Sequence, residues 1–333
     1  MTTTTTPETL VTERQRTIDG TWRWLGRYGT LMMLALLIVV VGILEPSTFL
    51  TSDNLISILN QGSLSAIIAI GLTFALVSGE FDLSIGNAAS LAAVVSCTLM
   101  VDHGISIPLA LLVAVLVGLA MGLINGLVVT KLNVNALVAT LGVGSLAVGV
   151  NFAIANGQPV TPPNVDSLLD ISLNTFLGIP YTVYIMVVVA IGAWLLLNRT
   201  VLGQSMQAVG GNPVAASLAG IRVERVKIIA FIVCSMLAGL TGILLVTRTG
   251  AAAASAGDSY LLAAFAAAFF GSAVMRDGEF HVIGTVVGVL TVSTGFNAIA
   301  LLGLDTYYQF LFQGLVLIVG VGVGSVARKR ATY

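Results

Sequence analysis

The chain has 333 residues, of which 57% are hydrophobic and only 9% are charged. An ordinary soluble domain has about 25% charged residues, and the mean hydropathy of +1.02 excludes a surface that is mostly exposed to water. The apolar runs are continuous rather than alternating, which argues against a membrane β-barrel. The net charge of −1, without a basic patch, argues against a nucleic-acid partner. The composition therefore predicts an all-α polytopic membrane protein surrounded by lipid.

The residue groupings typical of catalysis and metal binding are missing from the sequence. Cys97 and Cys234 lie singly inside apolar runs, and His103 and His281 are isolated, so neither a disulfide framework nor a metal site is expected. None of the lysines follows the G-x-x-x-x-G pattern of a phosphate-binding loop, and no GxSxG or HExxH motif occurs. We therefore expect no catalytic residue, no metal, no cofactor and no enzyme activity.

Charged residues divide the chain into apolar segments, each compatible with a membrane span of about 20 residues. In chain order, the ten expected spans are 28–44, 53–80, 82–102, 104–130, the segment after Lys131, 181–197, 228–247, 259–275, 280–304 and 307–326. The expected domains are a disordered cytoplasmic N-terminal tail (1–27), a transmembrane domain (28–327) and a cytoplasmic C-terminal tail (328–333). The second and third spans meet at a short motif that is either re-entrant or a cytoplasmic turn.

The distribution of Lys and Arg predicts the orientation, because these residues concentrate in cytoplasmic loops. When the N-terminus is placed in the cytoplasm and the chain alternates through ten spans, every Lys and Arg except Arg248 falls on the cytoplasmic side. The long polar stretch 156–180 has no Lys or Arg and falls on the extracytoplasmic side, while the longest cytoplasmic loop is 198–227. The sequence therefore predicts that both termini are cytoplasmic.

A polar motif separates the second and third spans. It contains two carboxylates, a hydroxyl and an amide, on Glu80, Asp82, Ser84 and Asn87. Glycines at positions 79 and 86 bracket the two carboxylates and permit a broken helix. Charged groups near membrane depth are costly and tend to face a pathway, so these four residues are candidates for the translocation path. An ordinary cytoplasmic turn, in which Asp82 or Ser84 caps the next helix, explains the motif equally well.

A second motif lies in the 198–227 loop and specifies a short helix. Asn212 is a good N-cap, Pro213 suits the first helical position, and Gly220 can end the helix. A helix of about seven residues is unstable alone, so it needs contacts with the membrane domain or with a partner. Its alanines form a small-residue face. The residues expected at a partner contact are Gly210, Gly211, Asn212, Pro213, Ala215, Ala216, Ala219 and Gly220.

Glycines elsewhere recur at helical spacing, which predicts close packing between membrane helices. The two runs are Gly118, Gly122 and Gly126, and Gly284 and Gly288. The segment 278–284 is also similar to the motif at 79–86, and this likeness is either an internal repeat or chance.

At its two polar motifs the chain resembles the ribose/xylose-type permeases of bacterial sugar ABC importers. That family has a G-[GI]-x-D-L-S-[VI]-G sequence, matched here by GEFDLSIG at 79–86, and a cytoplasmic G-G-N-x-x-A-A-x-x-x-G-I sequence, matched by GGNPVAASLAGI at 210–221. The segments VERVKIIAFIVCSMLAGLTGIL and DTYYQFLFQGLVLIVGV are also similar to the family, so the resemblance covers about residues 40–328. Glu80 stands where many members have glycine, and the sequence does not specify which sugar is bound.

The resemblance implies the permease subunit of an ABC importer that moves a pentose or hexose across the bacterial inner membrane. It implies about ten helices, two permease copies forming a homodimer, a cytoplasmic ATPase subunit that receives the 213–219 helix, and an extracytoplasmic sugar-binding protein. A separate ATPase subunit accounts for the missing phosphate-binding loop. The alternative is a secondary transporter or channel without an ATPase, in which only the Glu80/Asp82 motif offers carboxylates for ion coupling.

Overall fold

The computed structural model describes residues 28–163, 165–272 and 278–331, so the expected N-terminal tail lies outside these ranges. The elements in chain order are the helix Tyr28–Leu44, α2 (Pro46–Phe49), α3 (Ser52–Val77), α4 (Ile85–His103), α5 (Ile107–Lys131), α6 (Ala136–Ala155), α7 (Val165–Leu173), β1 (Thr175–Phe176), β2 (Ile179–Pro180), α8 (Tyr181–Arg199), α9 (Val201–Gly211), α10 (Pro213–Leu218), α11 (Val223–Thr249), α12 (Asp258–Ser272), α13 (Val282–Leu301) and α14 (Tyr307–Ala331). The last helix, α14, continues into the segment expected as a C-terminal tail.

The described helices confirm an all-α polytopic membrane protein. Seven of them, α3, α4, α5, α6, α8, α11 and α13, are long and apolar enough to cross a bilayer. Three shorter apolar helices, Tyr28–Leu44, Asp258–Ser272 and Tyr307–Gly322, lie at the other positions where the sequence predicts spans. Pro108 falls in the first turn of α5, where its missing N–H leaves no helical bond unmade. The total of ten spans stays a prediction.

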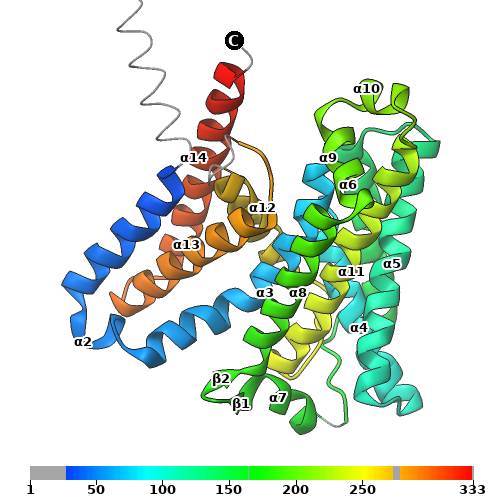
Figure 1. The fold of residues 1–333 in the computed structure, drawn as a ribbon. Helices are drawn as coiled ribbons and strands as arrows, with labels where there is room; N and C mark the ends of the chain where they lie inside the picture. Colours follow the sequence, from blue (N-terminus) through cyan, green and yellow to red (C-terminus); the bar gives the residue numbers. More distant parts are fainter. Residues whose placement is uncertain (1–27, 164, 273–277, 332–333) are drawn as a thin grey trace, which may run out of the picture.

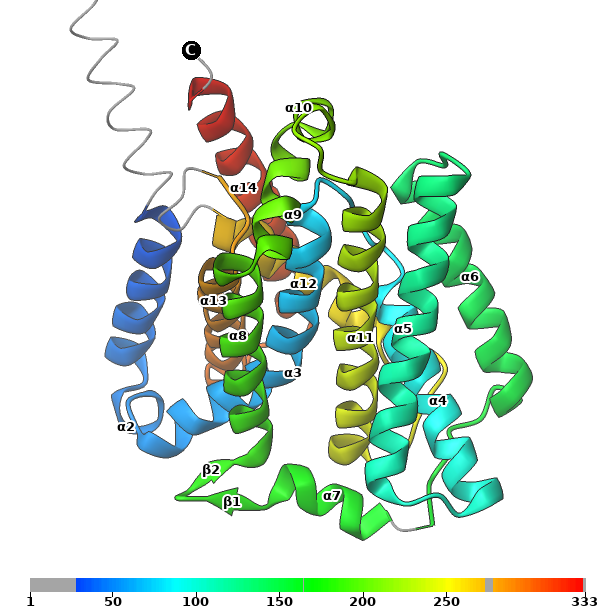
Figure 2. The ribbon, with the colours of Figure 1, turned by 45° about the vertical axis from the view of Figure 1, so that its right-hand side comes forward.

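The two long loops lie at opposite ends of the helical bundle. Figure 2 shows α10 and the end of α14 at one end, and it shows α7, β1 and β2 at the other end. The helix Tyr28–Leu44 begins on the side of the molecule where α10 lies and runs toward α2 (Figure 1). The loops 198–227 and 156–180 therefore lie at opposite ends of the bundle. The cytoplasmic position of both termini stays a prediction.

The helices α3–α6 and α11–α14 repeat one arrangement in opposite directions. α3 packs on α11, α12 and α13, and α11 correspondingly packs on α3, α4 and α5. α4 contacts α5 and α6, and α12 contacts α13 and α14 in the same way. Because α3 ends at the α10 end while α11 begins there, the two units are inverted (Figure 2). Inverted repeats of this kind are common in transporters.

A close contact between two glycines lies where the two units meet. A Cβ on Gly86, at the start of α4, would lie 2.8 Å from the carbonyl oxygen of Gly257, and a Cβ on Gly257 would collide with the carbonyl oxygen of Gly86. Two glycines and a serine recur at identical sequence separations in the two units. They are Gly79, Ser84 and Gly86 in the first unit, and Gly250, Ser255 and Gly257 in the second. The repeat therefore pairs 79–86 with 250–257, and it does not account for the likeness of 278–284 to 79–86.

The glycines at helical spacing lie at close helix contacts, as predicted. A Cβ on Gly118 or Gly122 of α5 would collide with the α11 backbone, and a Cβ on Gly126 would lie 2.8 Å from the Cα atom of Ile228. Gly284 and Gly288 of α13 pack against α12 in the same manner. Any side chain at these positions would push the helices apart, so the glycines allow the backbones to approach closely.

Both long loops contain more regular structure than the sequence predicts. The 156–180 loop forms α7 and a short antiparallel hairpin, and Ser172 of α7 lies 2.5 Å, hydroxyl to hydroxyl, from Thr247 of α11. The 198–227 loop contains α9 in addition to the expected short helix. Thr200 caps α9 by accepting a hydrogen bond from the Gly203 N–H at 3.1 Å, and Met206 is buried against the bundle. Tertiary contacts stabilise these segments, whose sequences are polar or short.

Candidate functional site

The chain leaves helical geometry between α3 and α4. The Ser78 hydroxyl donates to the Phe74 carbonyl at 3.0 Å as α3 ends, and Gly79 adopts a φ of 80°, which an L side chain would resist. The Glu80 N–H then bonds to the Ala75 carbonyl at 2.9 Å. Helical structure resumes at Ile85, so the motif at 79–86 contains a break between two apolar helices.

Asp82 lies within this break and is fully buried. Its Oδ1 atom accepts hydrogen bonds from the Ser84 N–H at 2.9 Å and from the Ser84 hydroxyl at 2.6 Å. Its Oδ2 atom accepts from the Ser235 hydroxyl of α11 at 3.3 Å. Asn125 of α5 donates to the Ser84 hydroxyl at 2.8 Å and lies 3.5 Å from both carboxylate oxygens. The cluster therefore joins the helix break to α5 and α11.

Asp82 stabilises this cluster through the hydrogen bonds that its carboxylate accepts. A donor left without its acceptor inside a protein costs about 1–3 kcal/mol. Removing the Asp82 carboxylate would leave three donor groups, on the Ser84 backbone, the Ser84 hydroxyl and the Ser235 hydroxyl, without their acceptor. The first of these bonds also satisfies a backbone N–H at the start of α4, in the manner of a cap, although the Ser84 side chain makes no cap hydrogen bond itself.

The other two candidate path residues lie outside this cluster. Glu80 forms an ion pair with Lys227 near the start of α11, and both side chains are largely buried. Asn87 donates to the Gly144 carbonyl of α6 at 2.9 Å, and α6 also reaches the break through the Thr140 hydroxyl, which accepts from the Leu83 N–H at 3.1 Å. The structure thus brings Asp82 and Ser84 together, and it directs Glu80 and Asn87 to different helices.

Sequence reasoning missed the side-chain partners of this motif on α5, α6 and α11, which include Asn125, Thr140, Ser235 and Lys227. Asn125 had a usable signal, because it is an amide inside an apolar span and lies directly before Gly126, one of the packing glycines. Ser235 and Lys227 had no such signal, because a serine in a membrane helix and a lysine at a helix end are both common.

The short helix α10 forms as its sequence predicts. The Asn212 side chain accepts hydrogen bonds from the N–H groups of Val214 and Ala215, both at 3.0 Å, and Pro213 occupies the first turn. Gly220 follows the helix with a φ of 85°. The helix ends at Leu218, one residue earlier than the expected end at Ala219. Asn212 also ends α9, so α9 and α10 meet at one capped residue.

The exposed face of α10 differs from the expected alanine face. Ala216 is buried, in a cluster with Phe74, Met206 and other residues of the same chain, so it is not available to a partner. Val214 and Leu218 are instead 68% and 86% exposed. The remaining expected contact residues, Gly210, Gly211, Asn212, Pro213, Ala215, Ala219 and Gly220, are exposed. The structure therefore corrects the assignment of Ala216, because this side chain holds α10 on the bundle.

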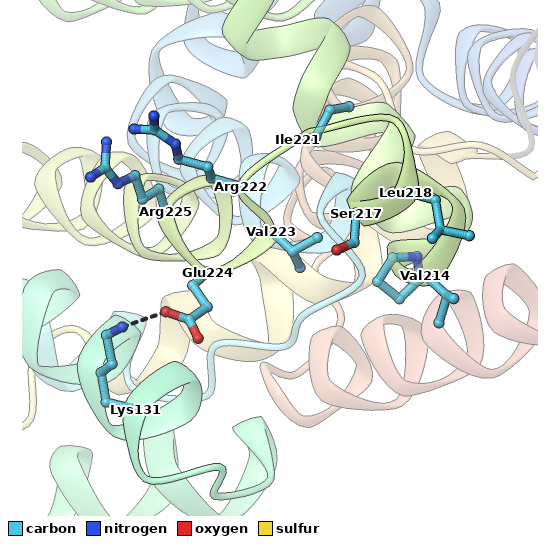
Figure 3. A pocket seen from close by; sticks show the side chains of 10 residues that line it. Lys131, Val214, Ser217, Leu218, Ile221, Arg222, Val223, Glu224 and Arg225 are labelled. Atoms are coloured by element: carbon cyan, nitrogen blue, oxygen red, sulfur yellow. Dashed lines mark hydrogen bonds and ion pairs between the residues drawn. The ribbon is translucent and has the colours of Figure 1, made fainter.

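A wide cavity of about 850 Å³ lies beside α10. Figure 3 shows Val214 and Leu218 on α10 and shows Arg222 and Arg225 at the start of α11. An ion pair between Lys131 and Glu224 closes its other side (Figure 3). The surface therefore combines exposed apolar side chains with two arginines for which the structure gives no ion pair among the described residues.

The opposite end of the molecule also exposes apolar side chains. Leu173, Phe176 and Leu177, which lie on α7 and at the hairpin, are between 57% and 83% exposed. The hairpin is tied to the bundle because the Tyr184 hydroxyl of α8 donates to the Phe176 carbonyl at 2.8 Å. Exposed apolar groups on an ordered loop are typical of a surface that binds a partner.

Several curated proteins are similar to the chain over nearly its whole length. The ribose import permease protein RbsC of Escherichia coli (strain K12) is 36% identical, covering 92% of this chain and 97% of the relative. Its counterpart in Bacillus subtilis (strain 168) is 35% identical, covering 94% and 97%. The L-arabinose ABC transporter permease protein AraH of Azospirillum brasilense is 31% identical, covering 92% and 89%. No solved structure matches the chain.

The family model described as "Branched-chain amino acid transport system / permease component" matches residues 54–321, from the start of α3 to the apolar part of α14. This range includes the helix break with its Asp82 cluster, the α9–α10 corner and both units of the inverted repeat. The chain is a member of this family of transport-system permease components.

Proposed function

We propose that the chain is the membrane-spanning permease subunit of an ABC importer for a monosaccharide, a pentose or hexose, in the bacterial inner membrane. The observation that supports this function most directly is the similarity over nearly the full length to permeases named for ribose and L-arabinose import. The helix break between two apolar helices and the inverted repeat are features of transporters. On this proposal, ATP is hydrolysed by a separate subunit.

The ATPase subunit is proposed to bind the surface formed by α10 and the start of α11. Val214 and Leu218 expose apolar side chains that water solvates poorly, and Arg222 and Arg225 lie beside them (Figure 3). A partner that buries the two apolar groups and offers carboxylates to the arginines fits this chemistry. The surface proposed for coupling therefore excludes the buried Ala216 and includes the exposed side chains of Val214 and Leu218.

The extracytoplasmic sugar-binding protein is proposed to dock on α7 and the hairpin. This surface lies at the end of the bundle opposite α10 (Figure 2). It presents Leu173, Phe176 and Leu177 on a segment that the Tyr184 hydroxyl holds in place. A binding protein that delivers its sugar there needs a firm but reversible contact, and a small exposed apolar patch provides one.

The four candidate path residues are proposed to act by attaching the helix break to the helices around it. Asp82 and Ser84 are buried and bonded to α5 and α11, and Glu80 is paired with Lys227. Their polar groups are therefore engaged with the chain itself. The sugar path, between two permease copies or through each bundle, would then be lined by other residues, which the helix break holds in place. Two copies, as in the homodimer that the family resemblance implies, remain part of this proposal.

Transport by purified components tests this function. The permease, its ATPase and its binding protein are reconstituted in proteoliposomes with ATP inside, and uptake of labelled ribose, allose and arabinose is measured. We expect uptake of at least one sugar, which requires the binding protein and stops when the phosphate-binding lysine of the ATPase is replaced by alanine. Equal uptake without the ATPase would instead support a secondary transporter or channel, and no uptake of any monosaccharide would contradict the sugar assignment.

A further inference from the structure

The α9–α10 corner is connected to the centre of the bundle through α9. α10 packs mainly on α9 and on the start of α11. α9 in turn packs on α8, α11 and the end of α3. α9 and α10 meet without a linker, because Asn212 ends one helix and caps the next. A displacement of α10 is therefore transmitted to α9, and α9 contacts α3 where α3 ends.

The contact between α9 and α3 is made by backbone against backbone. A Cβ on Gly210 would collide with the Val77 carbonyl oxygen and would lie 3.2 Å from the Gly79 nitrogen. From the other side, a Cβ on Gly79 would lie 3.5 Å from the Gly210 Cα atom. At the next residue, Gly211, an added Cβ would have no neighbour within 4 Å. Gly210 thus lies directly on the first residues of the helix break, with no side chain between them.

The helix break also holds an aromatic side chain beside a cavity. Phe81 is 36% exposed and stacks on Phe265 and Phe269 of α12, with ring centroids 6.4 Å and 6.3 Å apart. A cavity of about 480 Å³ is lined by Phe81, Gln207 and Gly210 together with residues around Phe280. The cavity therefore lies between the α9 contact and the aromatic stack, so a shift of either one changes its width.

We propose that the Gly210 contact transmits movement of α10 to the helix break, which makes Gly210 a positioning residue for the transport step. When the ATPase displaces α10, α9 pushes or releases the backbone at Val77 and Gly79. Because Gly79 has a positive φ and helical structure is absent as far as Ser84, the break can change shape without unwinding α3 or α4. Phe81 then moves against Phe265 and Phe269, and the cavity opens or closes to the sugar. This inference rests on the proposed function.

The contact of α10 with α11 offers a second route, but it is less suited to this task. α11 is a continuous helix from Val223 to Thr249 and packs closely on α5 through the α5 glycines. Moving it would require repacking two long membrane helices. The Gly210 contact instead bears on a segment that is already non-helical and that is held to α5 and α11 through side chains rather than through long helical contacts.

A pair of glycine substitutions tests the inference in the complete reconstituted importer. Gly210→Ala adds a methyl group against the Val77 carbonyl, whereas Gly192→Ala adds the same group to α8, outside the α9–α10 corner, with no neighbour within 4 Å. We measure ribose uptake and ATP hydrolysis in the same proteoliposomes and compare the sugar moved per ATP hydrolysed. For Gly210→Ala this ratio should fall roughly tenfold, while Gly192→Ala should stay within about twofold of the unmodified chain.

The ratio separates the proposed role from a merely structural one. A Gly210→Ala complex that assembles but loses uptake and hydrolysis in equal proportion leaves the ratio unchanged, and that outcome overturns the proposal, as does an equal fall in the ratio for Gly192→Ala. Absence of coupled uptake by the unmodified importer contradicts the proposed function itself and is therefore distinguishable from failure of the inference.

If the Gly210→Ala complex does not assemble, a reversible cross-link tests whether movement between α9 and the helix break is needed for uptake. Gln207→Cys and Phe81→Cys place thiols on α9 and on the break, both lining the same cavity, in a chain whose Cys97 and Cys234 are replaced by alanine. Bridging the two thiols with a cleavable reagent should stop uptake while hydrolysis continues, and cleavage should restore uptake. Full uptake by the bridged complex would overturn the proposal.

Discussion

At the scale of single residues, Asp82 shows why a charged residue in a membrane protein is not always in contact with the substrate. Its carboxylate is completely buried and accepts hydrogen bonds from a backbone N–H and two serine hydroxyls. These donors come from the break itself and from α11, and Asn125 adds α5 through Ser84. A carboxylate is well suited to this role because it accepts several hydrogen bonds at once.

Two substitutions separate the hydrogen-bonding role of Asp82 from its charge. In Asp82→Asn, one amide oxygen can still accept both bonds from Ser84, and the amide nitrogen can donate to the Ser235 hydroxyl. We expect the purified permease to keep most of its thermal stability and uptake to fall by no more than about twofold. In Asp82→Ala the donors lose their acceptor, and stability should fall by about 1–3 kcal/mol per donor left unsatisfied.

The measurements are thermal unfolding in detergent and uptake by the assembled importer. Glu80→Gln serves as the matched control, because it neutralises the other carboxylate of the motif while leaving the buried cluster intact. If Asp82→Asn preserved stability but lowered uptake several-fold, the charge itself would have to lie on the sugar path, which is the role expected from the sequence motif.

At the scale of elements, α10 shows how the same short helix has one face for the bundle and another for a partner. Ala216 is buried against residues that include Met206 of α9, so a bulky residue there would displace α10 from its own chain. The sequence predicts a partner contact at this position because alanine is small. Ala216 is buried, whereas Val214 and Leu218, two positions away on either side, are exposed and available to a partner.

A charged residue on the exposed face of α10 should weaken binding of the ATPase subunit. In Leu218→Asp the side chain that is 86% exposed becomes an anion, which favours water over an apolar contact. The apparent affinity for the ATPase should fall at least roughly tenfold, with membrane insertion of the permease unchanged. Co-purification and a binding titration in detergent provide the measurement.

Val201→Asp supplies the control for this experiment. Val201 is 81% exposed and lies at the start of α9, in the same loop but outside α10. Its substitution should leave ATPase binding within about twofold of the unmodified chain. Equal binding by Leu218→Asp and the unmodified permease would show that α10 is not the contact.

At the scale of the whole molecule, the two ends of the bundle should lie on opposite sides of the membrane. Ser167 is exposed on α7 and Ser217 is exposed on α10, at opposite ends of the structure. In a chain without Cys97 and Cys234, a cysteine at position 167 should react with a membrane-impermeant thiol reagent in intact cells. A cysteine at position 217 should react only after the cells are opened. The reverse labelling pattern would overturn the predicted orientation.

Elements with strong local signals could be predicted from the sequence. The apolar segments, the Asn212 cap, Pro213 in the first turn of α10 and the turn at Gly220 all depend on residues close together in the chain. α9 and α7 were missed, because their stability comes from contacts such as Met206 with the bundle and Ser172 with Thr247. Short amphipathic helices in polar loops give little periodicity by themselves.

The sequence by itself determined the membrane class, the positions of the apolar helices and the two motifs, since these follow from local composition and spacing. Only the tertiary structure decided which groups meet: Asp82 with Ser235, and Gly86 with Gly257. It also decided that Ala216 faces inward. These outcomes depend on how α3 and α11 pack in space, and side chains separated by 150 residues or more leave no local pattern from which their contact can be read.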